Sequence, residues 1–194
     1  IRALAKLLLD RVDGELSYEQ EKQVAYIAQA ANGLNELVND LLDIAKIEAG
    51  KVDVRPSVVD VGRMFSALRG MLRPLLVSEK LTLTFVEPEP PLELFTDEAK
   101  LSQILRNFIS NALKFTEAGE IIVRALSNAE KGVVVFEVAD TGVGIRQEEL
   151  QLIFEEFSQI EHPLQRKVKG TGLGLPLCRN LAKLLRGDVA VDRK

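Results

Sequence analysis

The chain has 194 residues, of which 46% are hydrophobic and 28% are charged, a balance typical of a soluble globular protein. Its formal net charge is −4, so the overall attraction to phosphate backbones that drives nucleic-acid binding is absent, and we predict no nucleic-acid partner. No apolar run approaches the roughly 20 residues of a membrane-spanning helix, and the single cysteine excludes an internal disulfide and fits a reducing, cytoplasmic compartment.

The N-terminal segment is predicted to be a helical hairpin. Ile1 to about Val12 has the pattern of the end of a helix, with Gly14 as its C-terminal cap. Ser17 and Gln20 have the form of a capping box that opens a second helix. We predict that this second helix runs from residue 18 to about residue 49 and ends before Gly50.

Apolar residues of the second helix follow one another at alternating intervals of three and four, which is the spacing of a heptad seam. Leu37, Leu42 and Ile44 widen the stripe, as is needed when a helix packs inside a four-helix bundle. Two helices cannot bury such a stripe alone, so we predict a homodimer that forms a four-helix bundle. Packing of the hairpin on the downstream part of its own chain is the alternative. The seam consists of Val24, Ile27, Ala31, Leu34, Val38, Leu41 and Ala45.

Strand and helix patterns are mixed in the remainder of the chain. Strands are predicted at residues 52–54, 81–86, 92–95, 120–126, 132–138 and 188–191, and helices at 61–77, 98–116 and 173–185. The proline-rich residues 87–91 are predicted to form a loop. This mixture favours a sheet covered on one face by helices. The fold class is therefore α+β, with a hairpin domain at residues 1–51 and an α/β sandwich domain at residues 52–194.

Three polar side chains share one face of the helix predicted at residues 98–116. Asn107, Asn111 and Lys114 are spaced three or four residues apart, which places them side by side. A carboxamide oxygen is a hard, neutral ligand suited to Mg²⁺, and a lysine beside it can neutralise phosphate charge. A plain solvated face is the alternative for this segment taken alone.

Two glycine-bearing segments follow. Residues 140–145 come directly after a strand, where glycines let the backbone approach a ligand and Asp140 can accept a hydrogen bond from an amine such as that of adenine. An ordinary Asp-x-Gly turn is the alternative. Residues 170–174 carry three glycines before the last helix and expose backbone N–H groups to an anion. The basic, loosely patterned residues 158–169 indicate a mobile lid over phosphates, with ordinary loop solvation as the alternative.

These segments, in this order, resemble the N, G1, F and G2 boxes of the histidine kinases, within the wider superfamily of gyrase, chaperone and mismatch-repair ATPases. The boxes correspond to residues 107–116, 140–145, 154–157 and 170–174. The heptad helix that ends at Gly50 is similar to the second helix of the family's dimerisation hairpin, so the resemblance covers nearly the whole chain. It implies a Bergerat-type ATPase domain that binds ATP and Mg²⁺. It also implies transfer of the γ-phosphoryl group to a histidine of the hairpin and then to an aspartate of a response regulator receiver domain.

The resemblance also implies roles for single residues. Asn111 would coordinate Mg²⁺, Asp140 would bind the adenine amino group, and Arg166 would reach the γ-phosphate from the lid. Asn111, Lys114 and Arg166 would be the catalytic residues. The nucleotide would be bound by Asn107, Asn111, Lys114, Phe115, Asp140, Gly142, Gly144, Ile145, Phe157, Arg166, Lys169, Gly170, Thr171, Gly172, Leu173 and Gly174.

The phospho-accepting histidine of the family is missing from this sequence. The resemblance places it upstream of Ile1, where any membrane attachment would also lie, and we expect the chain to be a fragment. The only histidine, His162, falls in the predicted lid. A pseudokinase scaffold that binds ATP and partners without phosphotransfer is therefore a second hypothesis. A gyrase-type ATPase is disfavoured by the hairpin and by a helix that carries Asn107 and Lys114 without the glutamate base of that class.

Overall fold

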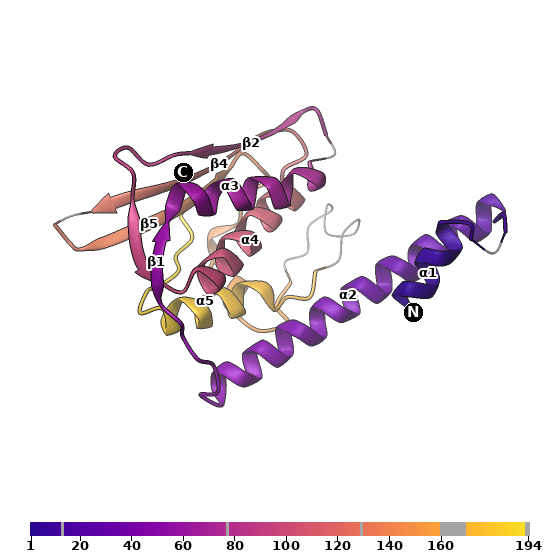
Figure 1. The fold of residues 1–194 in the computed structure, drawn as a ribbon, viewed down its shortest axis with the longest axis horizontal. Helices are drawn as coiled ribbons and strands as arrows, with labels where there is room; N and C mark the ends of the chain where they lie inside the picture. Colours follow the sequence, from indigo (N-terminus) through magenta and orange to yellow (C-terminus); the bar gives the residue numbers. More distant parts are fainter. Residues whose placement is uncertain (13, 77, 129, 160–169, 193–194) are drawn as a thin grey trace.

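The computed structural model describes residues 1–12, 14–76, 78–128, 130–159 and 170–192, which form a helical hairpin followed by an α/β unit (Figure 1). In the hairpin, the short helix α1 (Arg2–Leu9) lies along one end of the long helix α2 (Tyr18–Glu48). The other end of α2 leads into the α/β unit. In the described part of the chain, no helix combines the length and the apolar character needed to cross a bilayer.

The ends of the hairpin helices are set by local hydrogen bonds. The predicted capping box is confirmed, because Gln20 N donates to Ser17 Oγ at 3.3 Å and Ser17 N donates to Gln20 Oε1 at 2.9 Å. The prediction that Gly14 caps α1 is wrong. Arg11 adopts the left-handed conformation (φ 55°), and the N–H groups of Arg11 and Val12 bond to carbonyls of the last turn in a Schellman arrangement.

Five strands form two sheets. Strands β1 (Ser57–Asp60) and β3 (Glu93–Thr96) pair antiparallel. The second sheet has the order β2-β4-β5, in which β2 (Leu81–Val86) runs parallel to β4 (Gly119–Asn128) and β4 runs antiparallel to β5 (Val133–Asp140). The hairpin predicted from residues 120–126 and 132–138 is therefore confirmed.

Two of the predicted strands do not form. Residues 52–54 form no strand pairing, and backbone groups in this stretch bond instead to side chains at the start of α4 (Glu98–Phe115): Arg55 N donates to Asp97 Oδ2, and Asp53 O accepts from Lys100 Nζ. The strand in this region begins only after Pro56. Residues 188–191 are also not a strand, and Val189 N bonds to the Asp188 side chain at 2.8 Å.

Three helices complete the α/β unit, and two of them cover one face of the three-stranded sheet. These are α3 (Val61–Leu72), followed by a 3₁₀ turn (Arg73–Leu75), and α4 (Glu98–Phe115). Their apolar faces meet β2, β4 and β5 in the main core, where the rings of Phe65 and Phe85 lie 5.4 Å apart. The predicted layer of helices on the sheet is thus confirmed. The main core consists of Val59, Val61, Met64, Phe65, Leu68, Leu72, Phe85, Leu101, Leu105, Ile109, Val123 and Ala125.

A second core joins the hairpin to the α/β unit through α5 (Gly174–Leu184). Ile44 of α2 is 3% exposed and packs with Ile104 of α4 and with Leu173 and Leu177 at the start of α5. Leu37 packs against the same cluster. Leu37 and Ile44 were predicted to widen the heptad seam, but they bind the hairpin to its own chain instead. The seam lies on another side of α2, where Ile27, Leu34 and Leu41 are 52%, 59% and 45% exposed.

Candidate functional site

The predicted polar face of α4 lies against the glycine-bearing loop at residues 170–174. Asn107, Asn111 and Lys114 are all half-buried on α4. A methyl group at Gly174 would lie 3.1 Å from Asn107 Oδ1, and one at Gly170 would lie 2.9 Å from Lys114 Nζ. These close approaches require glycine or a displaced neighbour, so the loop and the polar face of α4 form one surface.

The C-terminal end of α4 meets the turn that carries Asp140. Gly142 N donates to Asp140 Oδ1 at 2.9 Å, the Thr116 hydroxyl donates to the same oxygen at 3.4 Å, and Val143 N donates to Phe115 O at 3.3 Å. A methyl group at Gly142 would lie 2.5 Å from Phe115 O and 2.7 Å from Asp140 Oδ1. The bare backbone at Gly142 is therefore what allows the carboxylate, Thr116 and the end of α4 to come together.

Phe157, in the segment predicted as the F box, also contacts the glycine loop. Phe157 N donates to Gly172 O at 3.2 Å, and both residues are in the left-handed region, with φ of 60° and 72°. A methyl group at Gly172 would lie 2.9 Å from the Phe157 backbone. Gly144 has φ 68°, and the neighbouring Ile145 is half-buried. Close backbone contact between residues 157 and 172 thus fixes the path of the loop before α5.

The glycine loop also contacts the hairpin. The Thr171 hydroxyl accepts a hydrogen bond from Leu173 N at 3.2 Å and donates one to Asp40 Oδ2 on α2 at 3.4 Å. Gln159 Nε2 donates to Gly170 O at 2.8 Å. The Thr171 hydroxyl and the Gly170 carbonyl are therefore bonded within the protein, and one of their partners, Asp40, comes from α2.

Burial shifts the ionisation of groups around this loop. Burial lowers the pKa of Lys114, and the nearby charge of Glu36 on α2 acts in the opposite direction. Lys114 Nζ also lies 5.2 Å from the centre of the Phe115 ring. Burial raises the pKa of Asp40, while the hydrogen bond from Thr171 opposes this rise. A half-buried cation on α4 and carboxylates on α2 thus flank the same loop.

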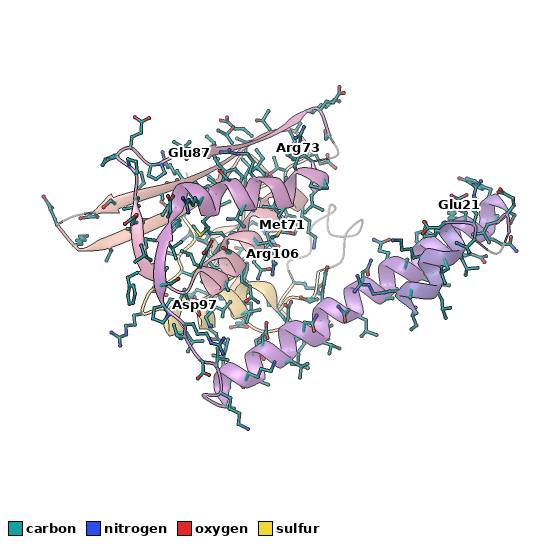
Figure 2. All side chains as sticks on the ribbon, in the orientation of Figure 1. Glu21, Met71, Arg73, Glu87, Asp97 and Arg106 are labelled. Atoms are coloured by element: carbon teal, nitrogen blue, oxygen red, sulfur yellow. The ribbon has the colours of Figure 1, made fainter. Side chains whose placement is uncertain are left out.

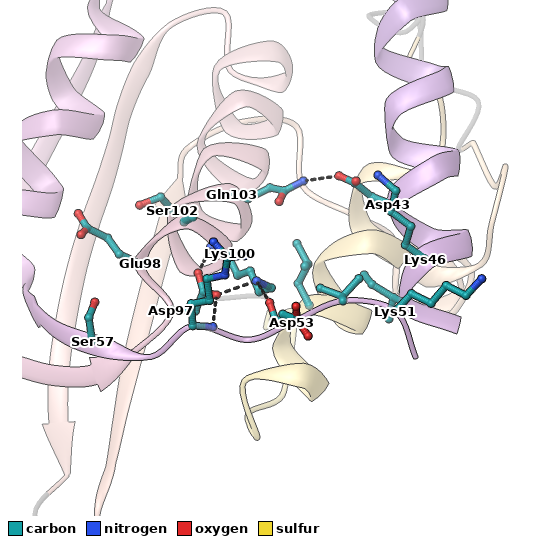
Figure 3. A pocket seen from close by; sticks show the side chains of 15 residues that line it. Asp43, Lys46, Lys51, Asp53, Ser57, Asp97, Glu98, Lys100, Ser102 and Gln103 are labelled. Atoms are coloured by element: carbon teal, nitrogen blue, oxygen red, sulfur yellow. Dashed lines mark hydrogen bonds and ion pairs between the residues drawn. The ribbon is translucent and has the colours of Figure 1, made fainter. Parts of the chain in front are cut away.

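A separate cavity of about 800 Å³ lies where the end of α2, the following linker and the start of α4 meet (Figure 3). Gln103 Nε2 donates to Asp43 at 3.1 Å across it, which links α4 to α2. Burial acts to raise the pKa of Asp97 at its edge, but hydrogen bonds from Arg55 N and from Lys100 lower it to about 2. The residues that line this cavity are not those of the predicted nucleotide site.

In the described ranges, no group of three or more His, Cys, Asp or Glu side chains could hold a metal ion.

The structure brings together most of the residues that the sequence singled out. The predicted lid residues Arg166 and Lys169, with His162, lie outside the described residues. Sequence reasoning missed Thr116, which is 3% exposed beside Asp140, although it directly follows the polar face of α4. It also missed Asp40, which no local pattern could have found because its partner Thr171 is 131 positions away.

Two family models match this chain. Residues 96–194 match the histidine kinase-, DNA gyrase B-, and HSP90-like ATPase, and residues 1–50 match the His Kinase A (phospho-acceptor) domain. The autoinducer 2 sensor kinase/phosphatase LuxQ of Vibrio harveyi is 37% identical over 196 residues, which cover 98% of this chain and 22% of LuxQ. The sensor histidine kinase RcsC of Escherichia coli is 33% identical over 179 residues, which cover 92% of this chain and 19% of RcsC. The chain thus spans about a fifth of the length of these relatives.

Solved structures with a similar fold include histidine kinases. Full-length ShkA in complex with AMPPNP superposes with a TM-score of 0.78 and 30% identity, covering 100% of this chain and 40% of ShkA. The histidine kinase AdeS of Acinetobacter baumannii has a TM-score of 0.65 at 20% identity, covering 92% of this chain and 79% of AdeS. At that identity, the second likeness concerns the fold alone.

Proposed function

Since this chain belongs to the histidine kinase family, we propose that it is the catalytic core of a sensor histidine kinase. In this proposal residues 52–194 bind ATP with Mg²⁺, and the γ-phosphoryl group passes to a histidine of the hairpin upstream of Ile1. An aspartate of a response regulator receiver domain then accepts it. Residues 1–51 form the dimerisation hairpin of a homodimer.

One observation carries this proposal: the polar face of α4, the Asp140 turn and the glycine loop meet around one end of α4. Asn107 lies against Gly174, Lys114 lies against Gly170, and Phe115 is bonded to the turn after Asp140. An adenine nucleotide with its metal requires four kinds of group. These are a carboxylate for the adenine amine, a cation and a glycine-rich backbone for the phosphates, and carboxamides for the metal. The donor set therefore fits both the nucleotide and magnesium.

The roles of the residues follow from their chemistry. Asp140 accepts a hydrogen bond from the exocyclic amine of adenine, and its own orientation is fixed by Gly142 N. Asn111 offers a carboxamide oxygen to magnesium, and Lys114 places its ammonium group beside the phosphates. Bound magnesium would neutralise charge on the phosphate oxygens. Backbone N–H groups of residues 170–174 would hold the phosphates at the start of α5, where the helix dipole favours an anion.

Replacing Asp140 tests the nucleotide site. Asp140→Asn removes the charged acceptor, and we expect ATP affinity to fall about 10- to 150-fold, because a hydrogen bond to a charged group is worth about 1.5–3 kcal/mol. Calorimetric titration with Mg-ATP measures this loss, and a parallel titration with GTP tests whether the preference for adenine is lost.

The matched control is Asp10→Asn, an exposed carboxylate of the hairpin, which should bind ATP as the wild type does. Circular dichroism of both variants checks that the fold is kept. If Asp140→Asn is folded and binds ATP with unchanged affinity, the assignment of the adenine pocket is wrong.

A further inference from the structure

Two carboxylates of α2 lie beside the groups that would hold the phosphates. Asp40 accepts the hydrogen bond of the Thr171 hydroxyl, and the exposed Glu36 lies one helical turn earlier on the same face of α2, where its negative charge acts to raise the pKa of Lys114. We propose that Glu36 and Asp40 form an acidic brake on the glycine loop, so that docking of α2 and binding of a nucleoside triphosphate oppose each other. This inference rests on the proposed nucleotide site and adds its regulation by the hairpin.

The hydrogen bonds of the loop show why docking and phosphate binding compete. The N–H group of Leu173, at the start of α5, is taken by the Thr171 hydroxyl, which in turn donates to Asp40. A phosphate at the start of α5 needs these same donors. Asp40 therefore holds Thr171 in the orientation that withdraws a donor from the ligand.

The negative charge of the α2 carboxylates also opposes nucleotide binding while α2 is docked. A nucleoside triphosphate brings several negative charges to the place where Glu36 and Asp40 already present carboxylates, and Asp43 follows on the same helix. Asp40 is half-buried, so water screens its charge less than that of an exposed side chain. Arg106 of α4 offsets part of the negative charge at Asp40. Repulsion between like charges thus favours release of α2 when the nucleotide binds.

Apolar contacts hold α2 in the docked position. Ile44 is buried against Leu173 and Leu177, and Asp43 is bonded to Gln103 of α4. The cluster that contains Ile44 includes Leu173 of the glycine loop and no residue of the sheet, so its packing depends on the path of residues 170–174. Docking therefore depends on the apolar packing of Ile44 and on the hydrogen bond of Asp40 to Thr171, and separate variants can weaken each of them.

Release of α2 from the loop does not require the predicted dimer seam to open. Glu36, Asp40 and Ile44 are spaced by four residues along one face of α2, whereas Leu34, Val38 and Leu41 lie on another, exposed face. By thermodynamic linkage, a nucleotide that weakens docking is itself bound more weakly while α2 is docked.

Removing the carboxylates should therefore strengthen nucleotide binding. We expect Asp40→Asn to bind a non-hydrolysable ATP analogue with Mg²⁺ about five-fold more tightly than the wild type, and Glu36→Gln/Asp40→Asn more tightly still. The matched control is Glu19→Gln, which removes the same charge from α2 about 30 Å along its axis, beyond the range of screened electrostatics. Figure 2 shows this distal end of α2, where the neighbouring Glu21 lies far from the α/β unit. Isothermal titration calorimetry measures all four affinities.

A second pair of measurements separates docking from a simple change of charge near the site. Ile44→Ala leaves the charge unchanged but weakens docking, so it should also strengthen binding of the analogue.

Spin labels on Lys22→Cys and Lys183→Cys, diluted with unlabelled protein, report the distance between α2 and α5 within one chain. Both positions are exposed, whereas Cys178 is fully buried and will not label. The distance distribution should broaden or shift when the analogue binds.

The outcomes distinguish the two proposals. If the wild type binds the analogue but Asp40→Asn and Ile44→Ala bind it with wild-type affinity, the brake is wrong and the nucleotide site stands. An unchanged label distance on binding also overturns the brake. If neither the wild type nor any variant binds, the nucleotide site itself is wrong and the brake falls with it.

Discussion

At the scale of single residues, Asp97 connects three parts of the chain. It is 4% exposed and caps α4 by accepting from Lys100 N at 3.1 Å, while its other oxygen accepts from Arg55 N at 2.9 Å and from Lys100 Nζ at 2.6 Å. Lys100 Nζ also donates to Asp53 O at 2.8 Å. These bonds fix the linker that follows α2 to the first turn of α4, which carries the polar face of the site.

The ionisation of Asp97 makes this connection dependent on pH. Its pKa in the folded protein is lowered to about 2, so the stabilisation is present above the ordinary pKa of 3.8 and is lost as the pH falls towards 2. Asp97→Asn should lower the free energy of unfolding at pH 7 by about 1–3 kcal/mol, because it removes charge-assisted bonds.

Urea unfolding at several pH values tests this prediction. The difference between wild type and Asp97→Asn should shrink from pH 4 downwards, since the wild-type side chain then becomes neutral as well. Glu130→Gln, at an exposed carboxylate of the β4–β5 hairpin, is the control and should have little effect. A difference between wild type and Asp97→Asn that stays constant down to pH 2 would contradict the role of the charge.

At the scale of elements, α2 has one face that packs against the α/β unit and another that is exposed in the single chain. One face carries Leu37 and Ile44, which pack against α5 of the same chain. The other carries the heptad seam, whose large apolar side chains are about half-exposed in the single chain. An apolar stripe of this kind is stable in water when a second copy covers it, which supports the proposed homodimer.

Substitutions in the seam test the homodimer. Leu34→Gln/Leu41→Gln places polar groups at two positions that a four-helix bundle would bury, so we expect the dimer to dissociate into monomers. Light scattering coupled to size exclusion gives the mass directly. Ala25→Gln, at an exposed position on the side of α2 away from the seam, should remain dimeric. A double variant that still has the mass of a dimer would argue against the seam as the interface.

At the scale of the whole molecule, Cys178 reports whether the second core is intact. It is fully buried between α4 and α5, its Sγ donates to Ile104 O at 3.8 Å, and burial raises its pKa to about 12. An exposed cysteine has a pKa of about 8.5 and is largely a reactive thiolate at pH 9. Cys178 should remain a neutral thiol at that pH.

Thiol titration with a chromogenic reagent at pH 9 checks this expectation. Native protein should react much more slowly than protein in denaturant, because reaction requires the second core to open. A cysteine introduced at the exposed Lys183 on the same helix should react at once. Equally fast reaction of Cys178 in native and unfolded protein would mean that α5 is not packed on α4.

Much of this molecule could be predicted from local sequence patterns. The capping box at Ser17, the amphipathic helix at residues 98–115 and the β4–β5 hairpin depend on residues close together in the chain, and all three are confirmed. Residues 52–54 show the limit of such patterns. They alternate like a strand, but Asp97 and Lys100 bind the neighbouring backbone groups and no strand partner remains.

The sequence by itself determined which segments are candidates for the nucleotide site: the polar face of α4, the Asp140 turn and the glycine loop are recognisable from residue type and spacing. It also determined the apolar seam of α2. Only the tertiary structure decided that Asp40 bonds to Thr171 and that Ile44 packs on the start of α5. Helical spacing relates residues three or four positions apart, whereas contacts across 131 positions depend on how whole elements pack.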